Sequence, residues 1–587
     1  MKLPSLLLSV LICGTSVPAL AASAATATAG AAHVRAAAVP AQLDAAARGN
    51  YRAVFAAIRA GDWSVAAARL DAIPDGLLTP LARAELYLAK GSPKVDGAAL
   101  LMLLTNSPEL PEADQLARLA RSRGVTAIPA LPSENGLRRQ PAAPRRQTAR
   151  SLRSDAAAAA LGAKITPLIK ADSPSAAEAL LIDAENRLTP EARTEWQQRV
   201  AWSYFLTGDD ASARRLAARA SAGSGEWTVQ ADWVAGLAAW RQRDYAAANG
   251  AFSAVAAHSR DPEMTAAGLF WAARSAMAAG HPEQVAPRLR SASRMSETFY
   301  GLLASASLGI TPPARAVRPA FTAADWSELA RTPNIRIAAA LTEIGETGLA
   351  DTVLRHQAAI GDARQHEALL HLAAQLRLPA TQIWLAQNAP AGAHLSVNTR
   401  YPAPAWTPQG GWRVDKALVY AHALQESQFR TTVVSPAGAR GLMQIMPATA
   451  QLIARRKGLP LGSLDDPETN IEYGQFYLEQ LRDAAGTGGL LPKVIAAYNA
   501  GPGAVLKWND RQRDRGDPLL FIESIPYWET RGYVAIVLRN YWMYQRSEGE
   551  KAESLKAMAQ GLWPRFPGLP GQLAVRLDGI GGMQSAD

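Results

Sequence analysis

Short amphipathic segments, each opened by a polar turn, fill the middle of this chain and constrain its fold more than any other feature of the sequence. Three of these turns resemble one another; they begin at Gly61, Gly208 and Arg243, and each continues with an aspartate. Small residues follow at the packing positions, which lets neighbouring helices approach closely. Units of this kind stack into an extended helical array. Because their spacing is irregular, we predict a helical solenoid, or superhelix, rather than a defined repeat family.

The length of the chain and its composition predict several helical domains. At 587 residues the chain is too long for one hydrophobic core. Hydrophobic residues make up 48% of it and are rich in Ala and Leu, which favours an all-α protein. We divide the chain into a signal peptide (1–21), an N-terminal helical region (22–128), a basic Pro-rich linker or loop (129–150), the superhelical domain (151–395), a C-terminal catalytic domain (396–548) and a tail (549–587).

The segment 129–150 and the tryptophans of the superhelix each allow two interpretations. The segment lacks apolar periodicity, so a solvated linker is favoured over a strand whose arginines touch an anionic surface. Most of the tryptophans are expected in the core, and a minority would line a concave glycan-binding face. The tryptophans in question are Trp227, Trp233, Trp240 and Trp271.

The first residues predict export. Lys2 is followed by a mostly apolar run, and a small-x-small pattern ends at Ala21, as in a secretory signal peptide that is too short to span a membrane. Cys13 is the only cysteine, and Ile12 before it is not the small residue that lipidation requires. Cleavage after Ala21 is therefore favoured, and the mature chain would have no disulfide. We expect no transmembrane segment after cleavage.

Charge and motifs limit the classes of partner and cofactor. The formal net charge of +10 suits an anionic partner such as nucleic acid, the cell envelope or an acidic glycan. Export and the absence of a basic-aromatic motif argue against nucleic acid. His366 and His371 are five residues apart, whereas a zincin motif places its histidines at i and i+4, so no metal is expected. A P-loop, a dinucleotide fingerprint and a G-x-S-x-G elbow are also absent, and no cofactor is predicted.

Four short motifs follow one another in the C-terminal domain, and the first contains an acid. Gln425-Glu426-Ser427 ends a helix predicted over 414–429, where Val419 and Ala423 lie on the same face as Glu426. Apolar neighbours raise the pKa of a carboxyl group, which is what a general acid requires near neutral pH. A solvated surface glutamate is the alternative, and it would be favoured if this motif stood alone.

The other motifs supply turns, amides and tyrosines. They run from Ser435 to Gln444, from Ala497 to Gly503 and from Glu523 to Tyr527. Tyr498 and Asn499 end a predicted helix and either face a cleft or form a packed C-terminal turn. Tyr533 lies off the apolar stripe of a helix predicted over 526–544, and Asn470 is predicted to cap a helix ending at 481. Such groups suit the binding of a polar polymer.

Together these motifs resemble the signatures of the soluble lytic transglycosylases of bacterial cell walls. The resemblance is strong over 414–542; upstream, only 271–274 and 298–301 resemble parts of the family's helical superdomain. Leu424 departs from the arginine that is common before Gln-Glu-Ser. The resemblance implies a superhelical ring or horseshoe followed by a lysozyme-like α catalytic domain. It also implies a periplasmic enzyme that acts on peptidoglycan glycan strands, with other cell-wall enzymes as further candidate partners.

The resemblance further implies the reaction and the residues that perform it. The bond between N-acetylmuramic acid (MurNAc) and N-acetylglucosamine (GlcNAc) would be cleaved without water, leaving a 1,6-anhydro-MurNAc end. Glu426 would act first as acid and then as base, and Glu523 would orient the site or adjust the charge of Glu426. The remaining candidate substrate-binding residues are Ser435, Met443, Gln444, Tyr498, Asn499 and Tyr533.

Two alternatives remain open from the residues. Ordinary glycosidases use two carboxylates, so a hydrolytic muramidase would recruit Glu523 as the second. A non-catalytic scaffold that binds wall enzymes or glycan would not need Glu426, and the presence of Glu426 argues against it.

Overall fold

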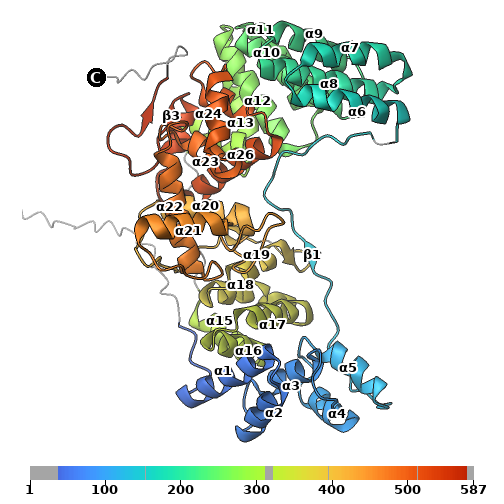
Figure 1. Ribbon diagram of the computed structural model, residues 1–587, viewed down its shortest axis with the longest axis vertical. Helices are drawn as coiled ribbons and strands as arrows, with labels where there is room; N and C mark the ends of the chain where they lie inside the picture. Colours follow the sequence, from blue (N-terminus) through green and yellow to red (C-terminus); the bar gives the residue numbers. More distant parts are fainter. Residues whose placement is uncertain (1–37, 153, 311–320, 394, 512, 578–587) are drawn as a thin grey trace, which may run out of the picture.

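The computed structural model describes residues 38–152, 154–310, 321–393, 395–511 and 513–577, so the predicted signal peptide and Cys13 lie outside the described residues. Within these ranges the chain forms helices α1 to α27 and only two short two-stranded sheets, which confirms the all-α prediction. The molecule is elongated: α1–α5 lie at one end, and the superhelix and the C-terminal domain lie side by side at the other (Figure 1). None of the helices in the described ranges is long and apolar enough to cross a bilayer.

Helices from two distant parts of the chain form the lower half of the molecule in Figure 1. Apolar side chains of both parts, among them Phe55, Leu104 and Leu341, belong to one buried core. The first part comprises α1 (Ala45–Ala60), α2 (Trp63–Ala72), α3 (Thr79–Leu88), α4 (Gly97–Asn106) and α5 (Ala113–Ser122). The second comprises α15 (Ala323–Leu329), α16 (Pro333–Glu343), α17 (Thr347–Ile360), α18 (His366–Gln375) and α19 (Pro379–Gln387).

The upper superhelix stacks successive helices, and most of them pack on the next one in the chain. The polar turns predicted to open helices do so: residues Gly61, Gly208 and Arg243 have φ of 77°, 89° and 62°, and each stands two residues before the start of a helix. This left-handed conformation reverses the chain within one turn. The helices are α6 (Ala156–Lys170), α7 (Pro174–Ala184), α8 (Pro190–Thr207), α9 (Asp210–Ser221), α10 (Trp227–Arg241), α11 (Tyr245–His258), α12 (Pro262–Ala278), α13 (Val285–Ser293) and α14 (Phe299–Ser307).

The segment between α5 and α6 is an ordered strap along the side of the molecule (Figure 1). Its strand β1 (Arg138–Arg139) pairs antiparallel with β2 (Asn388–Ala389), and the guanidinium of Arg539 donates to the carbonyl of Pro144. Arg146 of the strap is 13% exposed and forms an ion pair with Glu523. Most residues of 129–150 are exposed and none is fully buried, as in a linker, while Arg146 and the backbone contacts of the segment attach it to the domains on either side.

The C-terminal domain surrounds a long buried helix and shares its core with the superhelix. The predicted helices at 414–429 and 526–544 correspond to α20 (Lys416–Ser427) and α26 (Trp528–Ser547), which pack against each other. Residues 549–577 of the segment interpreted as a tail fold back, and Trp563 is fully buried. The other elements are α21 (Pro447–Lys457), α22 (Pro467–Arg482), α23 (Leu491–Ala500), α24 (Pro502–Arg511), α25 (Pro518–Glu523), α27 (Glu553–Ala559), β3 (Trp563–Pro564) and β4 (Ala574–Val575).

The predicted capping role of Asn470 is wrong. Asp466 caps α22, since its carboxylate accepts from the backbone of Thr469 and Pro467 takes the first helical position. Asn470 lies one turn further on and is fully buried. Its carbonyl oxygen accepts from the backbone N–H of Met443 at 2.8 Å, and its amide donates to the carbonyls of Arg440 and Leu464. It therefore holds the loop before α21 in place.

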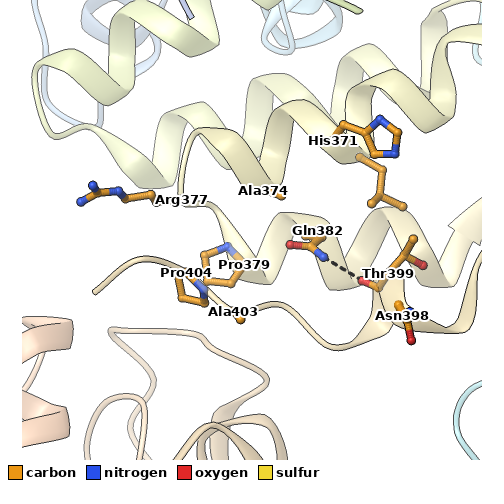
Figure 2. A pocket seen from close by; sticks show the side chains of 10 residues that line it. His371, Ala374, Arg377, Pro379, Gln382, Asn398, Thr399, Ala403 and Pro404 are labelled. Atoms are coloured by element: carbon orange, nitrogen blue, oxygen red, sulfur yellow. Dashed lines mark hydrogen bonds between the residues drawn. The ribbon is translucent and has the colours of Figure 1, made fainter. Parts of the chain in front are cut away.

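The two histidines singled out in the sequence have separate surroundings. The ring of His366 is buried and its Nε2 lies 2.9 Å from the carbonyl of Leu385. His371 borders a small cavity of about 60 Å³, in which the Gln382 amide donates to the carbonyl of Thr399 (Figure 2). Within the described ranges, no group of three or more His, Cys, Asp or Glu residues is placed to hold a metal ion.

Candidate active site

Glu426 lies on the last turn of α20, at the end of a mostly buried helix. The helix stops because Gln428 and Phe429 both take left-handed conformations, with φ of 52° and 61°. Phe429 then packs against Tyr420 and Trp406, which fixes the chain as it leaves the helix. Burial raises the pKa of the half-buried Glu426 carboxyl to about 7, the direction expected from the sequence. A carboxyl group with this pKa exchanges protons readily near neutral pH.

Tyr533 of α26 holds the Glu426 carboxyl directly. Its hydroxyl donates to Oε1 of Glu426 at 2.5 Å, and the same hydroxyl lies 2.8 Å from Nδ1 of His422. Because this hydrogen bond favours the ionised carboxylate, it lowers the pKa of Glu426 and offsets part of the effect of burial. The nearby charge of Glu529, on the first turn of α26, raises the pKa of Glu426.

His422 is a member of this site that the sequence analysis missed. It is fully buried, and burial lowers its pKa to about 3, so the ring is neutral at physiological pH. When Tyr533 donates to Glu426, His422 must donate from Nδ1 to the tyrosine oxygen. When Glu426 is protonated and donates to Tyr533, the tyrosine can donate to Nδ1 of the other neutral tautomer of His422, which carries its proton on Nε2. His422 therefore supports Tyr533 in either protonation state. Its spacing of i−4 from Glu426, on the same face of the helix, was the available signal.

The loop between α20 and α21 carries three of the predicted residues. Ser435 closes a tight turn, because its hydroxyl accepts from the backbone of Ala439 at 3.0 Å. Gln444 has a φ of 49°, and its amide donates to the carbonyls of Val433 and Gly441. A left-handed glutamine is uncommon and persists only where its surroundings hold it. Ser435 and Gln444 therefore shape the loop, and both remain partly exposed.

Met443 occupies the interior of that loop. Its side chain is fully buried and packs against Gly474, where an added Cβ would come within 2.1 Å of the methionine sulfur. Its carbonyl accepts from the hydroxyl of Tyr498 at 2.7 Å. The thioether is thus part of the core, and Met443 fixes Tyr498 through its backbone.

Tyr498 and Asn499 end α23 beside these groups. The rings of Tyr498 and Tyr533 are parallel within 9°, with centroids 6.4 Å apart, and the ring of Tyr498 lies 4.5 Å from that of His422. The side-chain oxygen Oδ1 of Asn499 accepts from the hydroxyl of Thr530 at 2.6 Å. The structure therefore brings Glu426, Tyr498 and Tyr533 together around His422.

Glu523 is held elsewhere, in a buried network that joins three parts of the chain. It is 2% exposed, and both of its oxygens accept from Arg146 of the strap, at 2.7 and 2.9 Å. The Tyr300 hydroxyl of the superhelix also donates to it at 2.7 Å and itself accepts from Trp271. Burial alone would raise the pKa of Glu523, but the charge and hydrogen bonds of Arg146 outweigh it and lower the pKa. Glu523 thus remains a carboxylate with both oxygens engaged.

Part of the C-terminal domain matches a known family. Residues 407–521 match the transglycosylase SLT domain. The soluble lytic murein transglycosylase of Escherichia coli K12 is 41% identical over 155 residues, which are 26% of this chain and 24% of the relative. The relative from Salmonella typhimurium is 41% identical over 159 residues, again 26% and 24% of the two chains. The matched stretch therefore spans about a quarter of the length of these curated relatives.

The solved structures cover most of the chain at low identity. The 70 kDa soluble lytic transglycosylase of Escherichia coli gives a TM-score of 0.51 at 19% identity, covering 88% of this chain and 99% of that chain. Its complex with bulgecin A gives a TM-score of 0.53 at 19% identity, with the same coverage. An inactive Glu-to-Gln mutant of the lytic transglycosylase Slt from Pseudomonas aeruginosa gives 0.51 at 19% identity, covering 85% and 86%. This likeness confirms the predicted fold class, a superhelix followed by a lysozyme-like domain.

Proposed function

We propose that this chain, a member of the soluble lytic murein transglycosylase family through its domain at residues 407–521, cleaves the β-1,4 bond between MurNAc and GlcNAc in peptidoglycan without water. The observation that carries the proposal is the Glu426 carboxyl, whose pKa is raised to about 7 and whose Oε1 is held by Tyr533. One group with this pKa is suited to give a proton in one step and to take one in the next.

In the proposed reaction, protonated Glu426 donates its proton to the bridging oxygen as that oxygen leaves C1 of MurNAc. The acetamido oxygen of MurNAc stabilises the positive charge that develops at C1. The Glu426 carboxylate then takes the proton of the MurNAc 6-hydroxyl, and O6 forms the new bond to C1. The proton count balances, and no water is consumed. Holding the 6-hydroxyl near C1 makes this step intramolecular, which replaces the activation of a water molecule.

The surroundings of the other carboxylates favour this route over hydrolysis. Glu523 was the second acid on which a muramidase would depend, and its oxygens are engaged by Arg146 and Tyr300. Glu529 is close enough for its charge to raise the pKa of Glu426, but it is exposed to solvent on α26. We therefore assign the acid and base roles to Glu426 alone. Ser435, Gln444 and Asn499 are proposed to hold the sugar or its acetamido group, next to Tyr498 and Tyr533.

Digestion of purified peptidoglycan in ¹⁸O-labelled water tests the reaction itself. We expect mass spectrometry to show anhydro-MurNAc ends that are one water lighter than reducing ends and carry no ¹⁸O, because water does not enter the reaction. Reducing MurNAc ends labelled with ¹⁸O would instead establish a muramidase. An unchanged polymer would favour the scaffold interpretation. A hydrolytic lysozyme on the same substrate provides the control for label incorporation.

Tyr533→Phe is expected to move the pH dependence of cleavage upward. Loss of the hydroxyl removes a hydrogen bond that favours ionised Glu426, so the pKa of Glu426 rises above about 7. Because the first step needs the protonated acid, the alkaline limb of the kcat/KM profile should shift to higher pH. We expect kcat to fall about tenfold, since the carboxylate formed in that step loses a stabilising partner.

Tyr498→Phe is the matched control, because its hydroxyl binds the Met443 carbonyl and not Glu426. The alkaline limb of the kcat/KM profile of this variant should stay at the wild-type pH even if KM rises. An unchanged limb in Tyr533→Phe would show that the hydrogen bond does not control the proton of Glu426.

The predicted signal peptide and the peptidoglycan substrate together support a periplasmic location. Glycan strands are the proposed partner, and other cell-wall enzymes remain candidates.

A further inference from the structure

A second cavity lies between the superhelix and the start of α26, and five tryptophans are among the residues that line it. Its volume is about 290 Å³. Trp196, Trp202, Trp227 and Trp233 of the superhelix line it on one side, and Trp528 lines it on the other. The guanidinium of Arg531 lies 4.2 Å from the ring of Trp202 and 5.5 Å from that of Trp528. Flat apolar surfaces of this kind pack well against the C–H faces of sugar rings.

Polar groups without partners also face this cavity. Gln198 is 7% exposed and Gln230 is half-buried; both line the cavity, and their side-chain amides have no hydrogen bond to a described residue but remain accessible to solvent. The indole nitrogen of Trp233 is buried and likewise has no acceptor among the residues that the structure describes. A buried N–H group almost always has a hydrogen-bond partner, so the indole of Trp233, beside two amides in the lining of the same cavity, points to a polar occupant.

Two arginines and two glutamines are among the polar residues of the lining. Arg199 lies over the rings of Trp196 and Trp227, but its guanidinium is paired with Glu195. Arg531 donates two of its N–H groups to the carbonyl of Ile525 and keeps its positive charge. The lining therefore offers amides, which pair with hydroxyl and acetamido groups, beside one buried cation. Because Arg531 would also attract an acidic group, a binding test of this cavity includes an isolated stem peptide.

The cavity adjoins another one that lies beside Glu426. Trp528 and Arg531 also line a neighbouring cavity of about 260 Å³, whose wall includes Gln425 and Tyr533. These two residues are the sequence neighbour and the hydrogen-bond partner of Glu426. Trp528 and Arg531 therefore form a wall between the two cavities.

We propose that the tryptophan-lined cavity is a second saccharide-binding site, which takes an N-acetylated sugar unit of the glycan strand through ring stacking and the amides of Gln198 and Gln230. The proposal rests on the proposed function for the identity of the glycan, but its binding step does not require cleavage. The site would hold the strand away from the scissile bond and would keep it bound to the superhelix between cleavage events.

Calorimetric titration of the full chain with a tetrasaccharide of N-acetylglucosamine tests this proposal. Glu426→Gln is used as the parent variant, so that cleavage cannot consume a ligand. We expect two binding sites per chain. Gln198→Leu should weaken one of them about tenfold or more, because a buried hydrogen bond to the sugar is lost, and leave the other unchanged. Gln242→Leu, a change of the same kind at an exposed position of the superhelix, should leave both unchanged.

Folding is checked by the thermal unfolding of each variant, and Gln230→Leu on α10 provides a second variant if Gln198→Leu does not fold. A single binding site that neither variant affects would overturn the proposal, and water would then be the occupant of the cavity. Binding of an isolated stem peptide that Gln198→Leu weakens, without a second site for the tetrasaccharide, would overturn the assignment to glycan. Failure of the proposed function would appear separately, as absence of cleavage by the wild-type chain.

Discussion

Glu426→Gln is expected to lower kcat for peptidoglycan cleavage by about 10³-fold or more, since a single carboxyl serves as both acid and base. Glutamine has nearly the same shape, and its carbonyl oxygen can still accept from Tyr533, so the site should keep its geometry. It can neither give a proton to the leaving oxygen nor take one from the 6-hydroxyl. KM should change little, because the neutral amide resembles the protonated carboxyl that first meets the substrate. The measurement is the initial rate of release of anhydro-MurNAc products from purified peptidoglycan.

Glu529→Gln is the matched control for this variant. The substitution removes a carboxylate from the same surroundings. In the wild type the charge of Glu529 raises the pKa of Glu426. The substitution should therefore lower that pKa and move the alkaline limb of the kcat/KM profile to lower pH, while kcat at the optimum stays within a few-fold. If Glu426→Gln kept more than about a tenth of the wild-type kcat, the proton donor would have to be another group.

Thermal unfolding shows whether the loss of activity reflects chemistry or instability. The pKa of Glu426 is raised in the folded protein, so the stability linked to its proton is fully present below about pH 4.5 and is lost as the pH rises through about 7. The Gln variant has no charge to bury. It should therefore be as stable as the wild type in acid and more stable above pH 7, by up to about 3 kcal/mol. An inactive variant that is also more stable at alkaline pH cannot owe its inactivity to unfolding.

Local patterns in the sequence predicted the parts of the site that depend on neighbours in the chain. The environment of Glu426 follows from helical periodicity, because Val419 and Ala423 lie one to two turns before it on α20. The polar turns at Gly61 and Gly208 open helices as predicted, and glycine suits the left-handed conformation that the structure shows there. The same helical periodicity would also have placed His422, one turn before Glu426, on the same face of α20. What distinguishes these cases is that the residues responsible lie within a few positions of one another.

Contacts between distant segments could not be predicted in this way. Arg146 and Glu523 are 377 residues apart, and nothing in the composition of the strap indicates which carboxylate it meets. The upstream residues Trp271 and Tyr300 belong to the stretches that resemble the family's helical superdomain. The sequence does not indicate that their hydrogen bonds lead to Glu523. Asn470 was misplaced for the opposite reason: its preference for helix caps is local, whereas its burial against the loop of Met443 is tertiary.

Arg146→Met is expected to cause the largest loss of stability, about 3–5 kcal/mol, because it leaves the buried charge of Glu523 without its partner. The two side chains are 13% and 3% exposed, so water cannot replace the guanidinium. Tyr300 alone offers one hydrogen bond to the remaining carboxylate. The loss is measured by thermal and denaturant unfolding, and proteolysis of the strap should accelerate because its anchor is removed.

The double variant Arg146→Met with Glu523→Gln separates the charge from the packing. With neither charge present, most of the lost stability should return, since a neutral amide is far less costly to bury than a carboxylate. Arg511→Met is the control at an exposed ion pair, where Arg511 and Asp172 are 71% and 51% exposed, and it should change stability by no more than about 1 kcal/mol. The same double variant also tests the role of Glu523 in the reaction. If the pair is structural, the folded double variant should still release anhydro-MurNAc ends at a rate within a few-fold of the wild type. A folded double variant without activity would make Glu523 part of the chemistry.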